Sequence, residues 1–145
     1  MTYANAVDNH IFGIQTSGYS MPTGCVGEII SASNTGGTSP TSGANFNIMS
    51  LTTTLAGYWE MWGNFYVLAQ SGISNAYAWI STTSATYPSN TTVTCIPGAN
   101  TPVAAGPAPM WTSYLPANTI VYLSGQGNFN GTATFYGNIF VKRYM

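Results

Sequence analysis

Few side chains in this sequence have the chemistry of a catalytic or metal-binding group. His10 is the only histidine among the 145 residues, and Asp8 lies close before it. Such a pair can bind a metal ion or transfer a proton, but without nearby strand or helix signals it is more typical of a solvated arm. Glu28 and Glu60 are the remaining carboxylates. Two glutamates can serve as the acid and base of a glycosidase, yet a lone glutamate in an uncharged strand is more often tied to a backbone or arginine partner.

Cys25 and Cys95 are the only cysteines. The sequence gives no distance between them, and a chain of this length can bury a core without a disulfide, so we expect free, buried thiols. The sequence contains no nucleophile elbow, no phosphate-binding glycine loop before a helix and no cysteine–histidine constellation. It therefore predicts a protein that is not an enzyme, with no catalytic residues, no metal site and no cofactor.

Charge is the most unusual feature of the composition. Only 3% of the residues are charged and the formal net charge is −1, whereas an average soluble domain has about 25% charged residues. Without a basic cluster, nucleic-acid binding is not expected. The sequence has no apolar run of about 18 residues and no signal-peptide pattern, so we expect neither membrane insertion nor Sec export. So little surface charge favours burial in an oligomer or a larger assembly.

The segment AGYWEMWGNFYV, residues 56–67, is unusually rich in aromatic side chains. A strand has a period of two, which divides these residues between two faces. One face holds Trp59, Met61, Gly63, Phe65 and Val67, and the other holds Tyr58, Glu60, Trp62, Asn64 and Tyr66. A strand with one solvated face normally shows polar residues on it, but both of these faces are largely apolar or aromatic. We expect one face to be covered by a second sheet and the other by something else.

Strand signals recur along the chain, whereas helix signals are nearly absent. The pattern predicts strands at residues 26–32, 45–54, 58–69, 76–82, 110–115, 119–129 and 132–142. The stretches SNTGGTSPTSG and IPGANTPVAAGPAP are rich in Gly, Pro and Ser and are predicted to be loops. Seven or more strands without crossover helices predict an all-β fold, an antiparallel β-sandwich of jelly-roll or related topology. Residues 1–22 are expected to be an extended arm that precedes a domain at residues 23–145.

Four glycines, Gly63, Gly125, Gly127 and Gly137, lie inside strong strand patterns. Glycine weakens a strand and usually marks a bulge or the close approach of a bulky neighbour. Two explanations are open at this stage. Each glycine makes room for a tryptophan of a facing strand, or neighbouring chains approach closely around an oligomer axis.

Taken together, several segments resemble small jelly-roll domains of tailed bacteriophages, which are similar in fold to tumour necrosis factor and C1q heads. The segments are LTTTLAGYWEMWGNF (51–65), ISTTSATYP (80–88), TIVYLSGQGNF (119–129) and TATFYGNIFVKRY (132–144), in the order of the family. The resemblance covers roughly residues 26–144. The N-terminal arm matches nothing in the family, and the positions of Trp62 and Met110-Trp111 are more aromatic than its pattern. Such domains occur in tail-needle knobs, fibre tips and capsid-attached proteins.

The resemblance implies a homotrimer in which each jelly roll contributes a sheet edge and an aromatic face to a three-fold axis. Tyr58, Trp62 and Tyr66 would then pack toward neighbouring subunits, with Glu60 at or near the interface. The implied function is a structural one in the virion, as a head decoration or as the tip of a tail or fibre, with other virion proteins as partners. We expect apolar residues of the arm to anchor the trimer to the particle; they are Tyr3, Ile11, Phe12 and Tyr19.

Two other functions are open. The protein could be a receptor-binding, lectin-like knob that contacts a host surface glycan, and a cluster of solvent-exposed aromatic residues would favour this function. The candidate residues are Trp79, Tyr87, Trp111 and Tyr114. It could also be a depolymerase whose carboxylates come from different subunits. A chain that begins at Met1 and contains no coiled-coil stalk would instead favour a standalone decoration protein.

Overall fold

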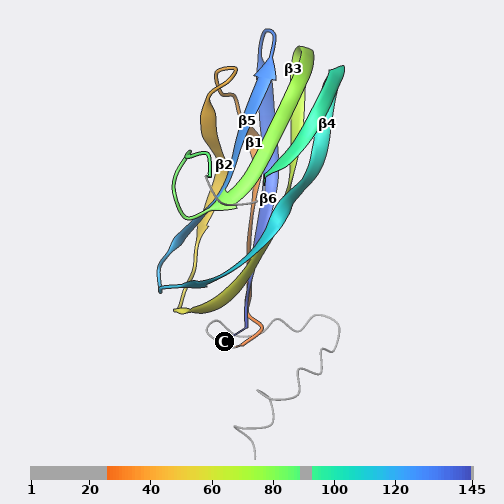
Figure 1. Cartoon of the computed structure of the whole chain (residues 1–145). Helices are drawn as coiled ribbons and strands as arrows, with labels where there is room; N and C mark the ends of the chain where they lie inside the picture. The colour runs from red at the N-terminus through yellow and green to blue at the C-terminus, as the bar shows by residue number, and fades with distance from the viewer. Residues whose placement is uncertain (1–25, 89–92, 145) are drawn as a thin grey trace, which may run out of the picture.

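The structure is a computed structural model that describes residues 26–88 and 93–144. The described residues form an all-β fold without helices, as the sequence predicts (Figure 1). The strands are β1 (Ile29–Thr38), β2 (Asn45–Thr52), β3 (Gly57–Ser81), β4 (Thr94–Leu115), β5 (Ile120–Phe129) and β6 (Ala133–Arg143). They pair antiparallel throughout. The predicted arm, with Tyr3, Ile11, Phe12 and Tyr19, lies outside the described residues.

The long strands β3 and β4 are the framework of this sheet. β3 has 25 residues and β4 has 22, whereas strands in globular proteins usually have about 5–6. The two strands pair with each other along most of their length, with irregular register between Leu68 and Asn75. The first part of β3 also pairs with β6, and the second part pairs with β5. β3 therefore joins one group of strands, β1 and β6, to another group, β5 and β2.

The sheet is curled, so that these two groups of strands face each other across one core. Phe46 of β2 and Phe135 of β6 come from different groups, and their ring centroids are 4.7 Å apart. At the ends of the strand order, Asn34 of β1 donates a hydrogen bond from Nδ2 to the carbonyl oxygen of Ile48 in β2, at 2.8 Å. The space between the groups is filled by buried side chains, which include Trp59, Met61, Phe65, Val67, Ile73, Ile80, Leu123 and Ile139.

The sequence prediction missed parts of β1, β3 and β4. The strands predicted at 58–69 and 76–82 are one continuous strand, and β1 extends to Thr38 through part of a predicted loop. The predicted loop IPGANTPVAAGPAP belongs to β4, of which only residues 110–115 were predicted. Among the described strands, β4 pairs on one side only, with β3. Prolines such as Pro107 and Pro109 are tolerated there because an edge strand has an open side that needs no ladder hydrogen bonds.

Close packing explains the glycines inside the strands. A Cβ atom added to Gly63 would lie 2.5 Å from the carbonyl oxygen of Asn138, and one added to Gly127 would lie 2.6 Å from Cζ of Phe135. The close approach predicted from the sequence is therefore confirmed at these positions. The expectation of a tryptophan neighbour is wrong, because the nearest atoms belong to the backbone of β6 and to a phenylalanine of the same chain.

We predict that Gly63→Ala destabilises the fold by about 1–3 kcal/mol, because the added methyl group would overlap a backbone atom that cannot rotate away. The matched control is Gly36→Ala in β1, where an added Cβ would meet only Asn34 Oδ1 at 4.0 Å. This control should change stability by less than about 0.5 kcal/mol. Urea unfolding of both variants measures the difference. Equal stability of the two variants would contradict the close approach at Gly63.

Candidate functional site

The most distinctive surface is the outer face of β1, β6, β3 and β4, which points away from the core. Alternation along β3 buries Trp59, Met61, Gly63, Phe65 and Val67, as the sequence predicts. The intervening residues form the outer face, on which the Tyr58 side chain is 52% exposed and the Tyr66 side chain is 38% exposed. The sequence also predicts that something covers this outer face of β3. The described residues of its own chain do not cover it.

Aromatic pairs cross this outer face from strand to strand. The register of the sheet sets residues of β3 opposite aromatic residues of β4 or β6, so that their rings contact each other. The pairs are Tyr58 with Tyr114, Trp62 with Phe140, and Tyr66 with Tyr136, with ring centroids 5.5, 5.6 and 6.0 Å apart. Cross-strand pairs of this kind stabilise a sheet by about 0.2–1 kcal/mol each. They also hold the rings in fixed orientations, which lowers the entropic cost of binding a partner.

Polar positions alternate with the aromatic pairs. Glu60 lies opposite Lys142 of β6 in the register, and its carboxylate accepts a hydrogen bond from the hydroxyl of Tyr144. The same hydrogen bond raises the pKa of the Tyr144 hydroxyl above its usual value, because the bond is lost on deprotonation. Lys142 Nζ lies 5.6 Å from the centroid of the Tyr144 ring. Farther along the strands, the backbone N–H of Asn64 donates to Oδ1 of Asn138 at 3.1 Å.

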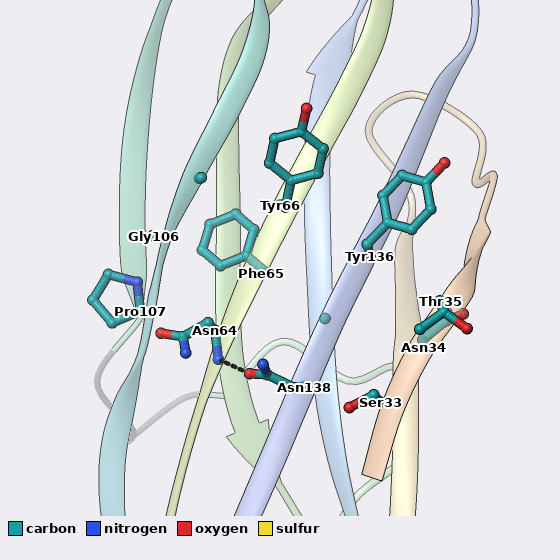
Figure 2. Close-up of a pocket in the computed structure, with 12 residues that line it drawn as sticks. Ser33, Asn34, Thr35, Asn64, Phe65, Tyr66, Gly106, Pro107, Tyr136 and Asn138 are labelled. Atoms are coloured by element: carbon teal, nitrogen blue, oxygen red, sulfur yellow. Dashed lines mark hydrogen bonds between the residues drawn. The ribbon is translucent and has the colours of Figure 1, made fainter.

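A groove of about 780 Å³ crosses the four strands at the level of Asn64 and Asn138 (Figure 2). Its floor and sides include the side chains of Ser33 on β1 and Pro107 on β4, and none of its lining residues is charged. A second groove, of about 570 Å³, lies on the outer face beside Glu60, Trp62 and Met110. The face therefore consists of raised aromatic pairs that are separated by hollows, a shape suited to interlocking with another surface.

The four residues expected at a subunit interface, Tyr58, Glu60, Trp62 and Tyr66, share this face. Of their partners, the sequence prediction named Tyr114 only as a possible glycan contact, and it did not include Tyr136, Phe140 and Tyr144. The sequence did contain a pattern that indicates Tyr136, Phe140 and Tyr144. Every second residue from 136 to 144 is alternately aromatic and polar, as on the outer face of β3. What the sequence could not provide is the register that sets these residues of β6 beside β3.

The aromatic residues considered as glycan contacts do not form one exposed cluster. Trp79 is fully buried and contacts Tyr87, with ring centroids 5.2 Å apart. Trp111 is partly buried against the core, whereas Tyr114 is 55% exposed on the outer face of β4. Trp111 and Tyr114 are three positions apart in one strand, so their side chains point to opposite faces. The four residues therefore do not form the solvent-exposed cluster that would favour a lectin-like function.

The two described glutamates do not form a carboxylate pair. Glu28 is buried, and its carboxylate accepts a hydrogen bond from Thr54 Oγ1 at 3.1 Å. The backbone N–H of Arg143 donates a hydrogen bond to the backbone carbonyl of Glu28, so these two residues lie beside each other. Arg143 in turn lies opposite the core residue Trp59, which puts Glu28 on the core side of the sheet. Glu60 lies on the outer face with Tyr144. The two carboxylates are therefore on opposite faces of the sheet.

Other candidate reactive groups are dispersed. Cys95 is a free thiol on the surface, so the expectation of a buried thiol is wrong for this residue. A hydrogen bond with Cys95 raises the pKa of the Tyr77 hydroxyl. Cys25, Asp8 and His10 lie outside the described residues. Within the described ranges, no group of three or more His, Cys, Asp or Glu residues is placed to hold a metal ion.

Comparison of the chain with protein-family models, curated proteins and solved structures gave no match. In residues 26–88 and 93–144, no helix has the length and apolarity that crossing a membrane requires. The structure itself defines an all-β protein with a curled antiparallel sheet and an aromatic outer face.

We predict that Glu60→Gln lowers the pKa of Tyr144 toward the ordinary value of 10.0, because a neutral amide accepts the hydrogen bond less strongly than a carboxylate. In the unchanged protein the folded-state pKa is raised. The stabilisation from this bond is therefore complete below about pH 10 and is lost as the pH rises through the folded-state pKa. NMR titration of tyrosine Cζ measures the pKa, and Tyr144→Phe assigns the signal. An unchanged pKa in Glu60→Gln would contradict the hydrogen bond.

Proposed function

We propose that this protein is a non-enzymatic structural protein of a bacteriophage virion that assembles as a homotrimer. In this proposal it decorates the head or forms the tip of a tail or fibre, and it is assembled in the host cytoplasm. The observation that supports it best is the aromatic outer face of β1, β6, β3 and β4. Large contiguous apolar patches are uncommon on monomeric proteins and usually mark surfaces that bind another protein.

The strand order supports a jelly-roll architecture. Residues 73–78 of β3 pair with 94–101 of β4, and residues 57–68 of β3 pair with 103–115 of β4. If each long strand is counted as two, the chain has eight strands in two groups of four. One group has the order β1-β6-β3-β4 and the other has the order β2-β5-β3-β4. Eight antiparallel strands in two sheets are the arrangement of a jelly roll, which agrees with the resemblance to phage domains.

The chemistry of the outer face supports self-association through that face. Among the described residues, Glu60 and Lys142 are its charged side chains, and three aromatic pairs cross it from strand to strand. The cores of protein interfaces have the same composition, with Tyr, Trp, Phe and Met enriched and charged residues depleted. Met110, on the same face, is 64% exposed. The hydrogen bond from Tyr144 gives Glu60 a partner, which reduces the cost of burying its carboxylate between subunits.

Association through the open edge of β4 is less favourable than association through this face. The open side of β4 would offer its backbone groups to an incoming strand. Pro102, Pro107 and Pro109 lie within β4, and a proline has no N–H to donate to a neighbouring strand. We therefore assign the subunit contacts to Tyr58, Glu60, Trp62 and Tyr66 of β3 together with their ring partners on β4 and β6.

We predict that light scattering at micromolar concentration gives a mass of three 15.3 kDa chains. We also predict that two tryptophan variants distinguish a core residue from an interface residue. Trp59 is fully buried in the core, so Trp59→Ala should cost each subunit about 3–5 kcal/mol. Trp62→Ala removes a ring from the outer face. It should make the melting temperature depend more steeply on protein concentration, because a weakened trimer dissociates on dilution before its subunits unfold.

Melting curves of both variants over a hundredfold dilution provide the comparison. A mass near that of one 15.3 kDa chain would contradict the trimer. If Trp62→Ala lost the same stability as Trp59→Ala at every concentration, Trp62 would belong to the intrachain packing and the face would need another partner.

We also propose that residues 1–22 anchor the protein to another virion protein through Tyr3, Ile11, Phe12 and Tyr19. This segment precedes the sheet and lacks the alternation of a core strand. Deletion of residues 1–22 should leave the oligomeric mass at three truncated chains and abolish incorporation into phage particles. Mass spectrometry of purified particles measures incorporation, with the full chain as control. Normal incorporation of the truncated protein would contradict the anchor.

A further inference from the structure

The outer face of β2, β5 and the second part of β3 carries a buried tryptophan that does not belong to the core. Trp79 is fully buried, but its neighbours Ala78 and Ile80 are in the core cluster and Trp79 is not. Its side chain therefore points away from the core, on the same face as its register partner Ser124 in β5. Residues 82–88, called here the strap, follow β3 (Figure 1) and bring the Tyr87 ring edge-on against the Trp79 indole.

The strap is tied to the sheet by one asparagine of β2. Asn47 donates from Nδ2 to Ser84 Oγ at 2.7 Å and accepts at Oδ1 from the backbone N–H of Ala85 at 2.8 Å. The same oxygen accepts from Ser124 Oγ of β5 at 2.9 Å. The other hydrogen bonds of the strap that involve described side chains are local. They join Thr83 to Ser81 at the end of β3 and Thr86 to Ser84, residues two positions apart. Loss of the Asn47 side chain would therefore release the strap while leaving its local structure in place.

The closed strap contains two unfavourable features. Ala85 has a φ of 46°, in the left-handed region that residues with a Cβ atom rarely adopt. In addition, Nε1 of Trp79 is buried without a hydrogen-bond partner among the described residues, although buried donors are normally paired. Opening of the strap would remove both features, since the backbone at Ala85 could relax and the indole N–H would reach water or a ligand. Unfavourable local features of this kind are concentrated at binding sites and switches.

The chemistry around Trp79 indicates what the opened surface would bind. The indole offers a flat apolar ring with a hydrogen-bond donor, and the adjacent side chains on the same face, Tyr77, Ser124 and Gln126, are uncharged hydroxyl and amide groups. The charged residues of the described chain lie elsewhere, on β3, β6 and the segment before β1. They are Glu28, Glu60, Lys142 and Arg143. A phosphate or carboxylate would therefore find no cation here. A pyranose ring would suit the site, because its C–H face stacks on an aromatic ring and its oxygens accept hydrogen bonds.

We propose that Trp79 is the centre of a saccharide-binding site that the strap closes, and that the ligand displaces the strap. The site lies across the core from the aromatic face of β1, β6, β3 and β4, so assembly through that face would not cover the strap. It does not depend on the proposed assembly. In this proposal the glycan binds to Trp79. The Tyr87 ring covers Trp79 in the closed state, and the sugar ring takes its place.

The first test measures opening of the strap in the full chain by hydrogen–deuterium exchange. Asn47→Ala should speed amide exchange in residues 82–88 by about tenfold or more, because it removes hydrogen bonds that hold the strap closed. Ala85→Gly should slow exchange, because glycine adopts the left-handed conformation without strain. The matched control is Asn128→Ala on β5, which removes the hydrogen bond to Asn75. Unchanged exchange in Asn47→Ala, or the same acceleration in the control, would overturn the strap.

The second test measures binding of the same proteins to an array of bacterial and animal glycans. Asn47→Ala should bind its glycans more tightly than the unchanged protein. The apparent affinity should rise by the same factor as the amide exchange rate of residues 82–88, because both depend on the fraction of molecules in which the strap is open. Trp79→Phe keeps a ring but loses the N–H and should abolish binding, whereas Gly36→Ala in β1, where an added Cβ has space, should leave binding unchanged. Tyr87→Ala, which removes the cover, should increase binding. Absence of binding by all the variants, or binding that survives Trp79→Phe, would overturn the saccharide site.

Discussion

The structure depends on β3 serving both halves of the sheet. Its first part pairs with β6 and its second part with β5, so one continuous strand sets the register of every other strand directly or through one neighbour. The period of two then fixes which side chains enter the core. A slip of one residue would exchange Trp59 for Tyr58 and expose the whole apolar set. The glycine at position 63 shows how tightly this register is held, because the backbone of β6 occupies the space where a methyl group would lie.

With so few charges, the chain uses asparagine for the polar connections that ion pairs often provide. Asn34 joins β1 to the backbone of β2, Asn47 joins β2 to the strap and to β5, and Asn138 joins β6 to the backbone of β3. A side-chain amide has both donors and an acceptor, so it can connect two backbone segments without the desolvation cost of a charge. Such connections are insensitive to salt and, through most of the pH range, to acid and base.

The sequence predicts those features that follow from local alternation. The all-β class, the buried set from Trp59 to Val67 and the grouping of Tyr58, Glu60, Trp62 and Tyr66 all come from the period of two. The opposite orientations of Trp111 and Tyr114 follow from the same rule, although the prediction grouped them. Features set by pairing could not be deduced, because they depend on contacts distant in sequence. These include the strand character of the proline-rich part of β4, the position of Phe140 beside Trp62, and the burial of Trp79 under a loop.

The position of β6 in the sheet has a consequence for synthesis of the protein on the ribosome. β6 lies between β1 and β3, yet it follows all the other described strands in the sequence. Until it has been translated, β1 lacks its ladder partner, and the rings contributed by β6 are missing from the aromatic face. Such non-local pairing forms slowly and exposes apolar surface meanwhile. The nascent chain therefore cannot present the complete aromatic face before β6 is in place, and assembly of the proposed trimer would have to wait until each chain has inserted this strand.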